Sequence, residues 1–103
     1  MPAAGPFEAL ADVNRRSILR LLGDRERSVP ELADALPISR PAVSRHLRLL
    51  KEAGMVTETV AGTRRIYRLR AEGPEAVERY LTSVWGDVAR RFTLAAENTR
   101  PDR

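Results

Sequence analysis

The clearest structural pattern in this chain lies in residues 37–56, P-I-S-R-P-A-V-S-R-H-L-R-L-L-K-E-A-G-M-V. Ser39 precedes a run of residues that contains no glycine before Gly54, and its hydroxyl can cap the free backbone amides at the start of a helix. Pro41 suits the first turn of that helix, because a backbone N–H there would have no partner within the helix. The stretch therefore predicts a helix over residues 39–53 that stops at Gly54.

The two faces of the predicted helix differ in chemistry. Its apolar residues recur three or four positions apart, which is typical of one buried stripe, and they are Val43, Leu47, Leu50 and Ala53. Its polar face contains no acid and consists of Arg40, Ser44, Arg45, Arg48 and Lys51. Ordinary solvated faces mix charges, because pairs of opposite charge four residues apart stabilise a helix. The polar face therefore favours a polyanion as its partner.

A β-hairpin is predicted directly after this helix. β-branched residues and a tyrosine flank a glycine-containing turn at residues 61–63, so strands are expected over residues 56–60 and 65–69. The inward contacts are expected from Ile66 together with either Tyr67 or Leu69. The tip and the return strand carry four cations, Arg64, Arg65, Arg68 and Arg70. A basic helix followed by a basic hairpin is the pattern of a winged helix-turn-helix.

The first third of the chain predicts three helices. A brief apolar stripe at Phe7, Leu10 and Ala11 is too short to be stable without packing against other elements. A second helix is expected to follow Asp12 and to end at Gly23, where a polar loop begins. Ser28 and Glu31 have the spacing of a capping box and predict a short third helix. The third and fourth helices would form the helix-turn-helix, whose second member lies in the major groove of DNA.

A long amphipathic helix is predicted over residues 74–98. Its apolar side chains include several of the largest in the chain, and a domain of 103 residues has little core left to cover them. We therefore expect a homodimer, with an interface formed by Phe7, Leu10, Leu81, Val84, Trp85, Val88 and Phe92. The whole chain, residues 1–103, is predicted as one mainly α winged helix-turn-helix domain with a small β-hairpin. The helix-turn-helix would occupy residues 28–53 and the wing residues 55–70.

Positive charge is concentrated in the predicted helix and hairpin. The net charge is only +4, but residues 40–70 hold eight cations against two acids, and the segments before and after each carry −1. This distribution is typical of a nucleic-acid footprint. The predicted contacts to double-stranded DNA are Ser39, Arg40, Pro41, Ser44, Arg45, His46, Arg48, Thr63, Arg64 and Arg65. For His46 two roles remain open, a donor to a DNA phosphate or a hydrogen-bonded residue at the edge of the core.

Composition disfavours several other classes of protein. The chain has no cysteine and one histidine, which excludes disulfides, thiolate metal sites and sites with several imidazoles, so no metal and no cofactor are expected. No apolar run approaches the roughly 20 residues that cross a bilayer, and the first residues lack the features of a signal peptide, which predicts a cytoplasmic protein without membrane contact. No serine lies in a G-x-S-x-G motif, and no catalytic residues or enzyme activity are predicted.

Four segments of the sequence resemble the ArsR family of bacterial repressors. They are L-A-D-V-N-R-R-S-I-L-R-L-L, E-L-A-D-A-L, S-R-P-A-V-S-R-H-L-R-L-L-K-E-A-G-M-V and G-T-R-R-I-Y-R-L. The resemblance implies a transcriptional repressor, such as an autorepressor, that forms a homodimer through its first and last helices and binds a palindromic operator. In such a dimer each recognition helix enters a major groove, and each wing contacts the adjacent backbone or minor groove.

The sequence departs from the metal-sensing members of that family. Their thiolate motif would fall where this chain has V-P-E-L-A-D-A-L, and their histidine and carboxylate ligands would fall on the last helix, which has no histidine. The chain is closer to the cysteine-free branch, and the resemblance leaves a small-molecule or protein inducer unidentified. The competing hypothesis is a winged helix that binds another protein. The shared positive charge of helix and hairpin disfavours it.

Overall fold

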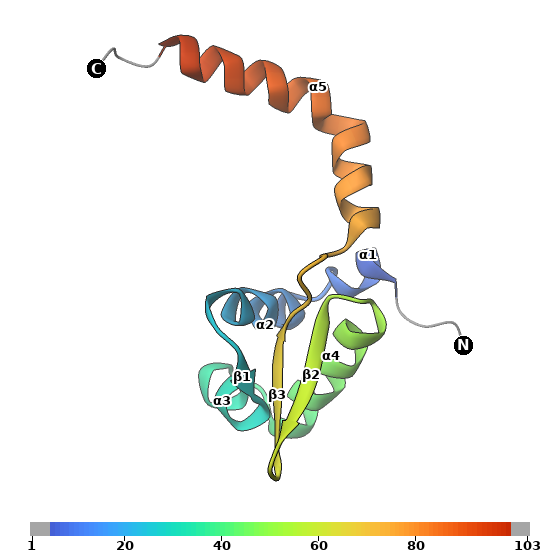
Figure 1. The fold of residues 1–103 in the computed structure, drawn as a ribbon, viewed down its shortest axis with the longest axis vertical. Coiled ribbons are helices and arrows are strands. Elements are labelled where there is room, and N and C mark those ends of the chain that lie inside the picture. Colours follow the sequence, from blue (N-terminus) through green and yellow to red (C-terminus); the bar gives the residue numbers. More distant parts are fainter. Residues whose placement is uncertain (1–4, 100–103) are drawn as a thin grey trace.

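The computed structural model describes the backbone of residues 5–99 and the side chains of residues 5–88. The elements, in chain order, are α1 (Pro6–Ala9), α2 (Val13–Asp24), β1 (Arg27–Ser28), α3 (Val29–Ala35), α4 (Arg40–Glu52), β2 (Val56–Ala61), β3 (Arg64–Leu69) and α5 (Glu75–Thr99). Figure 1 shows the first seven elements gathered in one body, from which α5 extends away. The predicted winged helix-turn-helix and its mainly α class are confirmed.

The predicted buried stripe on α4 lies at the centre of the core. Val43, Leu47 and Leu50 are completely buried, and Ala53 is partly buried against them. They belong to one cluster with residues from five other elements and the loop after α4, namely Ala9, Ile18, Leu22, Leu32, Met55, Val56 and Tyr67. Because this packing fixes the rotation of α4 about its own axis, the polar face of the helix is held toward the surface.

The predicted caps set the bounds of the central helices. The Ser39 hydroxyl accepts a hydrogen bond from the backbone N–H of Ala42 at 3.3 Å, and the chain leaves α4 through Gly54, whose φ of 76° favours glycine. At α3, the backbone N–H of Ser28 donates to the Glu31 carboxylate at 2.8 Å, and Glu31 N–H donates back to the Ser28 hydroxyl at 3.4 Å. These bonds confirm the capping box.

The sheet has one strand more than expected. β1 pairs antiparallel with β3, so that Arg27 lies opposite Tyr67 and Ser28 opposite Ile66, and the strand order is β1-β3-β2. The predicted polar loop after Gly23 is therefore partly wrong, and α2 also continues through Gly23 to Asp24. A strand of two residues has no alternation of polar and apolar side chains to reveal it, because it forms only by pairing with β3.

The hairpin is slightly longer than predicted. Its strands extend to Ala61 and begin again at Arg64, which leaves Gly62 and Thr63 as the turn, with Gly62 at a φ of 66°. Of the two candidates for the inward contact, Tyr67 is buried, whereas Leu69 is exposed.

The two terminal helices meet beside the body. α1 is a single turn whose buried residue is Ala9, so the predicted stripe at residues 7–11 was wrong in detail: Leu10 is partly buried beyond the helix and Ala11 is exposed. A one-turn helix is too short for a periodic pattern to identify its inner face. The Phe7 ring packs edge to face on Tyr80 of α5, with centroids 5.4 Å apart.

Helix α5 leaves a row of large apolar side chains about half-exposed. It begins at Glu75 and ends at Thr99, one residue later at each end than predicted. The half-exposed residues are Tyr80, Leu81, Val84, Trp85 and Val88. Phe92, which was also assigned to the interface, lies outside the residues whose side chains are described. None of the helices in the described part of the chain is both long and apolar enough to cross a membrane.

Candidate nucleic-acid interface

The polar face of α4 presents three arginines that have no partner among the residues that the structure describes. Arg40, Arg45 and Arg48 are exposed, and none of them forms a hydrogen bond or ion pair with another residue in the described part of the chain. Ser44 lies one helical turn before Arg48 and is exposed as well. Three unpaired guanidinium groups on a helix with a fixed orientation form a surface suited to DNA phosphates and base edges.

The N-terminal end of α4 adds a second group of exposed residues. Ser39 and Pro41 are both exposed beside Arg40. The oxygen of Ser39 accepts the capping bond from Ala42, which leaves the hydroxyl hydrogen available to another acceptor.

The hairpin tip lies close to α3 and α4. Arg64 donates to the Ser28 hydroxyl at 3.1 Å and to the Glu31 carboxylate at 3.4 Å, and Thr63 next to it is exposed. Arg65 forms an ion pair with Glu58 at 3.4 Å. Both wing arginines are therefore directed by carboxylates while remaining exposed, in contrast to the arginines of α4.

A shallow groove separates α4 from the wing, and we call it the helix–wing groove. One hollow of about 250 Å³ is lined by Ser28, Val29, Pro30, Ser44, Thr63, Arg64 and Arg65. A second hollow of about 380 Å³ is lined by Val29, Ser44, Arg48, Lys51, Glu58, Arg65 and Tyr67. Ser44 and Arg65 line both hollows, so the predicted contacts of the helix and of the wing face one continuous surface.

His46 is turned toward the first two helices. Its Nδ1 lies 3.3 Å from Nη1 of Arg15, whose guanidinium also donates to the backbone oxygens of Ala9 at 2.8 Å and Glu8 at 3.0 Å. An arginine can only donate, so the Nδ1 atom accepts and the ring hydrogen is on Nε2. Of the two roles left open for His46, this contact favours the residue at the edge of the core.

Glu58 is the carboxylate that lines the helix–wing groove. In the sequence it stands out only as one negative charge in a basic segment. Lys51 donates to it at 2.5 Å and the Tyr67 hydroxyl at 2.8 Å. These bonds, that of Lys51 foremost, hold the pKa of Glu58 below its usual range. Burial, together with the neighbouring carboxylate, raises the pKa of Tyr67. The carboxylate is therefore charged and the phenol neutral near pH 7.

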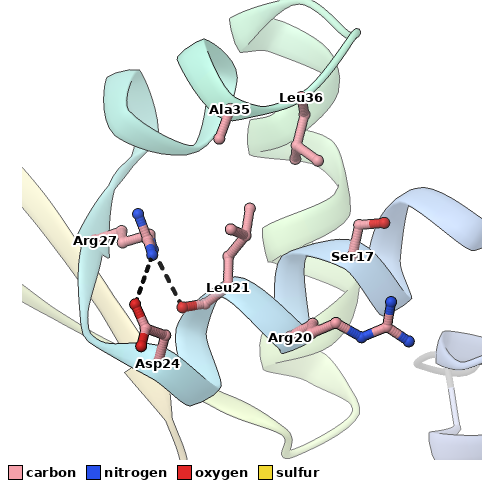
Figure 2. A pocket seen from close by; sticks show the side chains of 7 residues that line it. All are labelled: Ser17, Arg20, Leu21, Asp24, Arg27, Ala35 and Leu36. Atoms are coloured by element: carbon pink, nitrogen blue, oxygen red, sulfur yellow. Dashed lines mark hydrogen bonds and ion pairs between the residues drawn. The ribbon is translucent and has the colours of Figure 1, made fainter.

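A separate hollow of about 410 Å³ lies between α2 and α3. Figure 2 shows Arg27 on its wall, where Nε donates to the backbone oxygen of Leu21 at 3.1 Å and Nη2 pairs with Asp24 at 3.2 Å. These bonds fasten the end of α2 to β1. The residues that the structure describes contain no cluster of three or more histidines, cysteines or acids placed to hold a metal ion.

The order of helices, the hairpin and the helix–wing groove define the class of winged helix-turn-helix proteins. A family profile described as a helix-turn-helix domain matches residues 10–59. The transcriptional regulator Rv2034 of Mycobacterium tuberculosis is 47% identical over 79 residues, which are 77% of this chain and 74% of that protein. The repressor SmtB of the same organism is 44% identical over 70 residues, 67% of this chain and 52% of SmtB. The chain thus spans about half the length of SmtB.

A solved structure agrees in fold and sequence. The crystal structure of an ArsR family transcriptional regulator, RHA00566, matches with a TM-score of 0.70 and 30% identity, over 78% of this chain and 88% of that one. The chain belongs to the ArsR family of helix-turn-helix transcriptional regulators, as the sequence predicted.

Proposed function

We propose that this regulator is a repressor that binds a palindromic operator in double-stranded DNA as a homodimer. The observation that carries the proposal is the pair of faces on α4: Val43, Leu47 and Leu50 fix one side in the core, and unpaired arginines occupy the other. A helix held in this way can enter the major groove with Arg45 and Arg48 toward the base edges. Repression follows if the operator overlaps a promoter.

The wing and the start of α4 would contact the DNA backbone. Thr63 and Arg64 at the hairpin tip, and Ser39 and Arg40 at the start of α4, are all exposed. Contacts of this kind position a protein on DNA and carry little sequence information. We expect them to set the register in which the arginines of α4 meet the bases.

The half-exposed row on α5 supports the dimer. Five large apolar side chains exposed along one helix are more than a monomer of this size usually presents to water, and such patches mark interaction sites. A two-fold axis through α1 and α5 would place two copies of α4 in successive major grooves, with half-sites about 10 base pairs apart. The regulator would act in the cytoplasm, where bacterial DNA lies.

Binding to the DNA upstream of the protein's own gene tests the proposal. We expect saturable, salt-sensitive binding to that duplex and weaker binding to a shuffled duplex of the same composition. If the two duplexes bound equally weakly at all salt concentrations while a protein partner bound tightly, the alternative function as a protein-binding winged helix would be correct.

A further inference from the structure

Glu58 joins the recognition helix to the wing. It lies on β2 directly opposite Tyr67 of β3, whose hydroxyl donates to Oε2 at 2.8 Å. Oε1 accepts from Lys51 of α4, and Oε2 also pairs with Arg65 of β3. One carboxylate therefore bonds to side chains of both elements that we assign to the DNA surface.

We call Glu58, Lys51 and Arg65 the Glu58 cluster, and the carboxylate is its most buried side chain. The side chain of Glu58 is 16% exposed, whereas Lys51 is 53% and Arg65 is 66% exposed. Each cation has most of its surface in water and would be free to reach a phosphate if the carboxylate released it. The arginines at positions 40, 45 and 48 have no such partner in the described chain.

We propose that Glu58 is a positioning residue that holds Lys51 and Arg65 away from DNA phosphates and fixes the wing against α4. The inference rests on the proposed function, because it requires a DNA complex. Contacts to phosphate strengthen binding to every sequence alike, whereas specificity depends on the ratio of specific to non-specific affinity. Glu58 lowers the net charge of Lys51 and Arg65 from +2 to +1 and holds both side chains. This would lower non-specific affinity and leave the base-reading arginines unaffected.

The cluster should persist when DNA approaches. A carboxylate that is mostly buried and has lost its cationic partners is unfavourable, since its remaining partner would be a single phenol. DNA phosphates would therefore compete for Lys51 and Arg65 at a disadvantage. Glu58 also lines the helix–wing groove, so its charge repels a phosphate there directly.

The salt dependence of binding to a random-sequence 30-base-pair duplex measures how many phosphates the protein neutralises. Replacing Glu58 by glutamine (E58Q) keeps the shape of the side chain and removes its charge. We expect the slope of log affinity against log salt to steepen by about 0.9 for each released cation that reaches a phosphate, hence by about 1 to 2. The ratio of specific to non-specific affinity should fall.

The matched control is Glu52→Gln at the end of α4. It removes the same charge from an exposed side chain that has no ion-pair partner in the described structure. We expect its salt slope to equal that of the wild type. Equal slopes for the E58Q and E52Q variants, both checked for folding by thermal unfolding, would overturn the role of Glu58.

A second variant keeps the test decisive if E58Q does not fold. The double variant Lys51→Gln/Arg65→Gln should leave the slope of the wild type almost unchanged, because the two cations are withheld from phosphate. A slope shallower by about 2 would show that both contact DNA and would overturn the inference. If the wild type showed no salt-dependent binding to DNA, the proposed function itself would be contradicted. Failure of the proposed function and failure of the role of Glu58 therefore give different results.

Discussion

The ring of Phe7 meets the ring of Tyr80 at an interplanar angle of 83°, with the centroids 5.4 Å apart. Tyr80 in turn meets Trp85 edge to face at 6.3 Å. These contacts fasten the one-turn helix α1 to α5 and gather half-exposed aromatic rings at one place on the molecule. Edge-to-face pairs stabilise beyond the apolar area that they bury, and Tyr and Trp are enriched at protein interfaces. The terminal helices are thus arranged as one surface.

A charge in that surface should prevent dimerisation. Replacing Trp85 by glutamate would place an unpaired charge at the two-fold seam, which costs several kcal/mol. We expect the variant to sediment as a monomer at micromolar concentration and to lose tight operator binding. Ser83→Glu is the control, because two residues along a helix lie on nearly opposite sides. A Trp85→Glu variant that remained dimeric would disprove the assignment of the interface.

The arginines of α4 should determine sequence preference. Arg48→Ala or Arg45→Ala should weaken binding to the operator by about 1 to 3 kcal/mol each, and binding to shuffled DNA much less. Arg64→Ala in the wing should weaken both duplexes by similar factors. Arg20→Ala on α2, outside the proposed interface, serves as the control. Fluorescence anisotropy with both duplexes measures these affinities. If only Arg64→Ala weakened operator binding selectively, the wing would read the bases and the arginines of α4 would contact the backbone.

The capping box of α3 should make stability depend on pH. The backbone N–H and hydroxyl of Ser28, followed by Arg25, lower the pKa of Glu31 to about 2. A carboxyl pKa that is lower in the folded than in the unfolded chain contributes stability above about pH 4.3, and the contribution disappears as the pH falls toward 2. Urea unfolding should therefore show that the free energy of unfolding falls less between pH 6 and pH 2 for Glu31→Gln than for the wild type. Asp34→Asn, at an exposed position of α3, is the control. Its free energy of unfolding should fall with pH as much as that of the wild type.

Binding to the operator should not respond to metal ions. The chain offers no thiolate, and the Nδ1 of its one histidine faces Arg15. We expect the operator affinity to stay the same after treatment with a chelator and after addition of zinc, nickel or cobalt. Reproducible release of DNA by one of these ions would contradict this expectation and would implicate oxygen ligands on α5.

Residues close in sequence were predictable because their signals are local. The Ser39 cap, the buried stripe of α4, the capping box and the hairpin each depend on spacings of a few residues, and the structure confirms them. Strand β1 was missed because its two residues form a strand only through pairing with β3. Glu58 was counted as a charge alone, since its partners lie seven and nine residues away on elements whose packing the sequence does not specify.

The orientation of His46 shows the same limit. Its position next to the buried stripe was clear from the helical spacing, but the choice between DNA and the core depended on Arg15, 31 residues earlier in the chain. A long-range contact of this kind leaves no periodic pattern. The sequence therefore predicted the exposed polar face of α4 and the hairpin, but it did not reveal which of their cations are paired.

Footprinting of the wild-type protein on its operator would show whether a dimer reads two symmetric half-sites. The operator can be selected from a randomised pool of duplexes, and hydroxyl-radical cleavage then reports the protected positions. We expect two protected half-sites related by two-fold symmetry, about 10 base pairs apart from centre to centre, with one dimer bound per site. A single unsymmetric footprint from a monomer, or a pool that yields no preferred sequence, would contradict it.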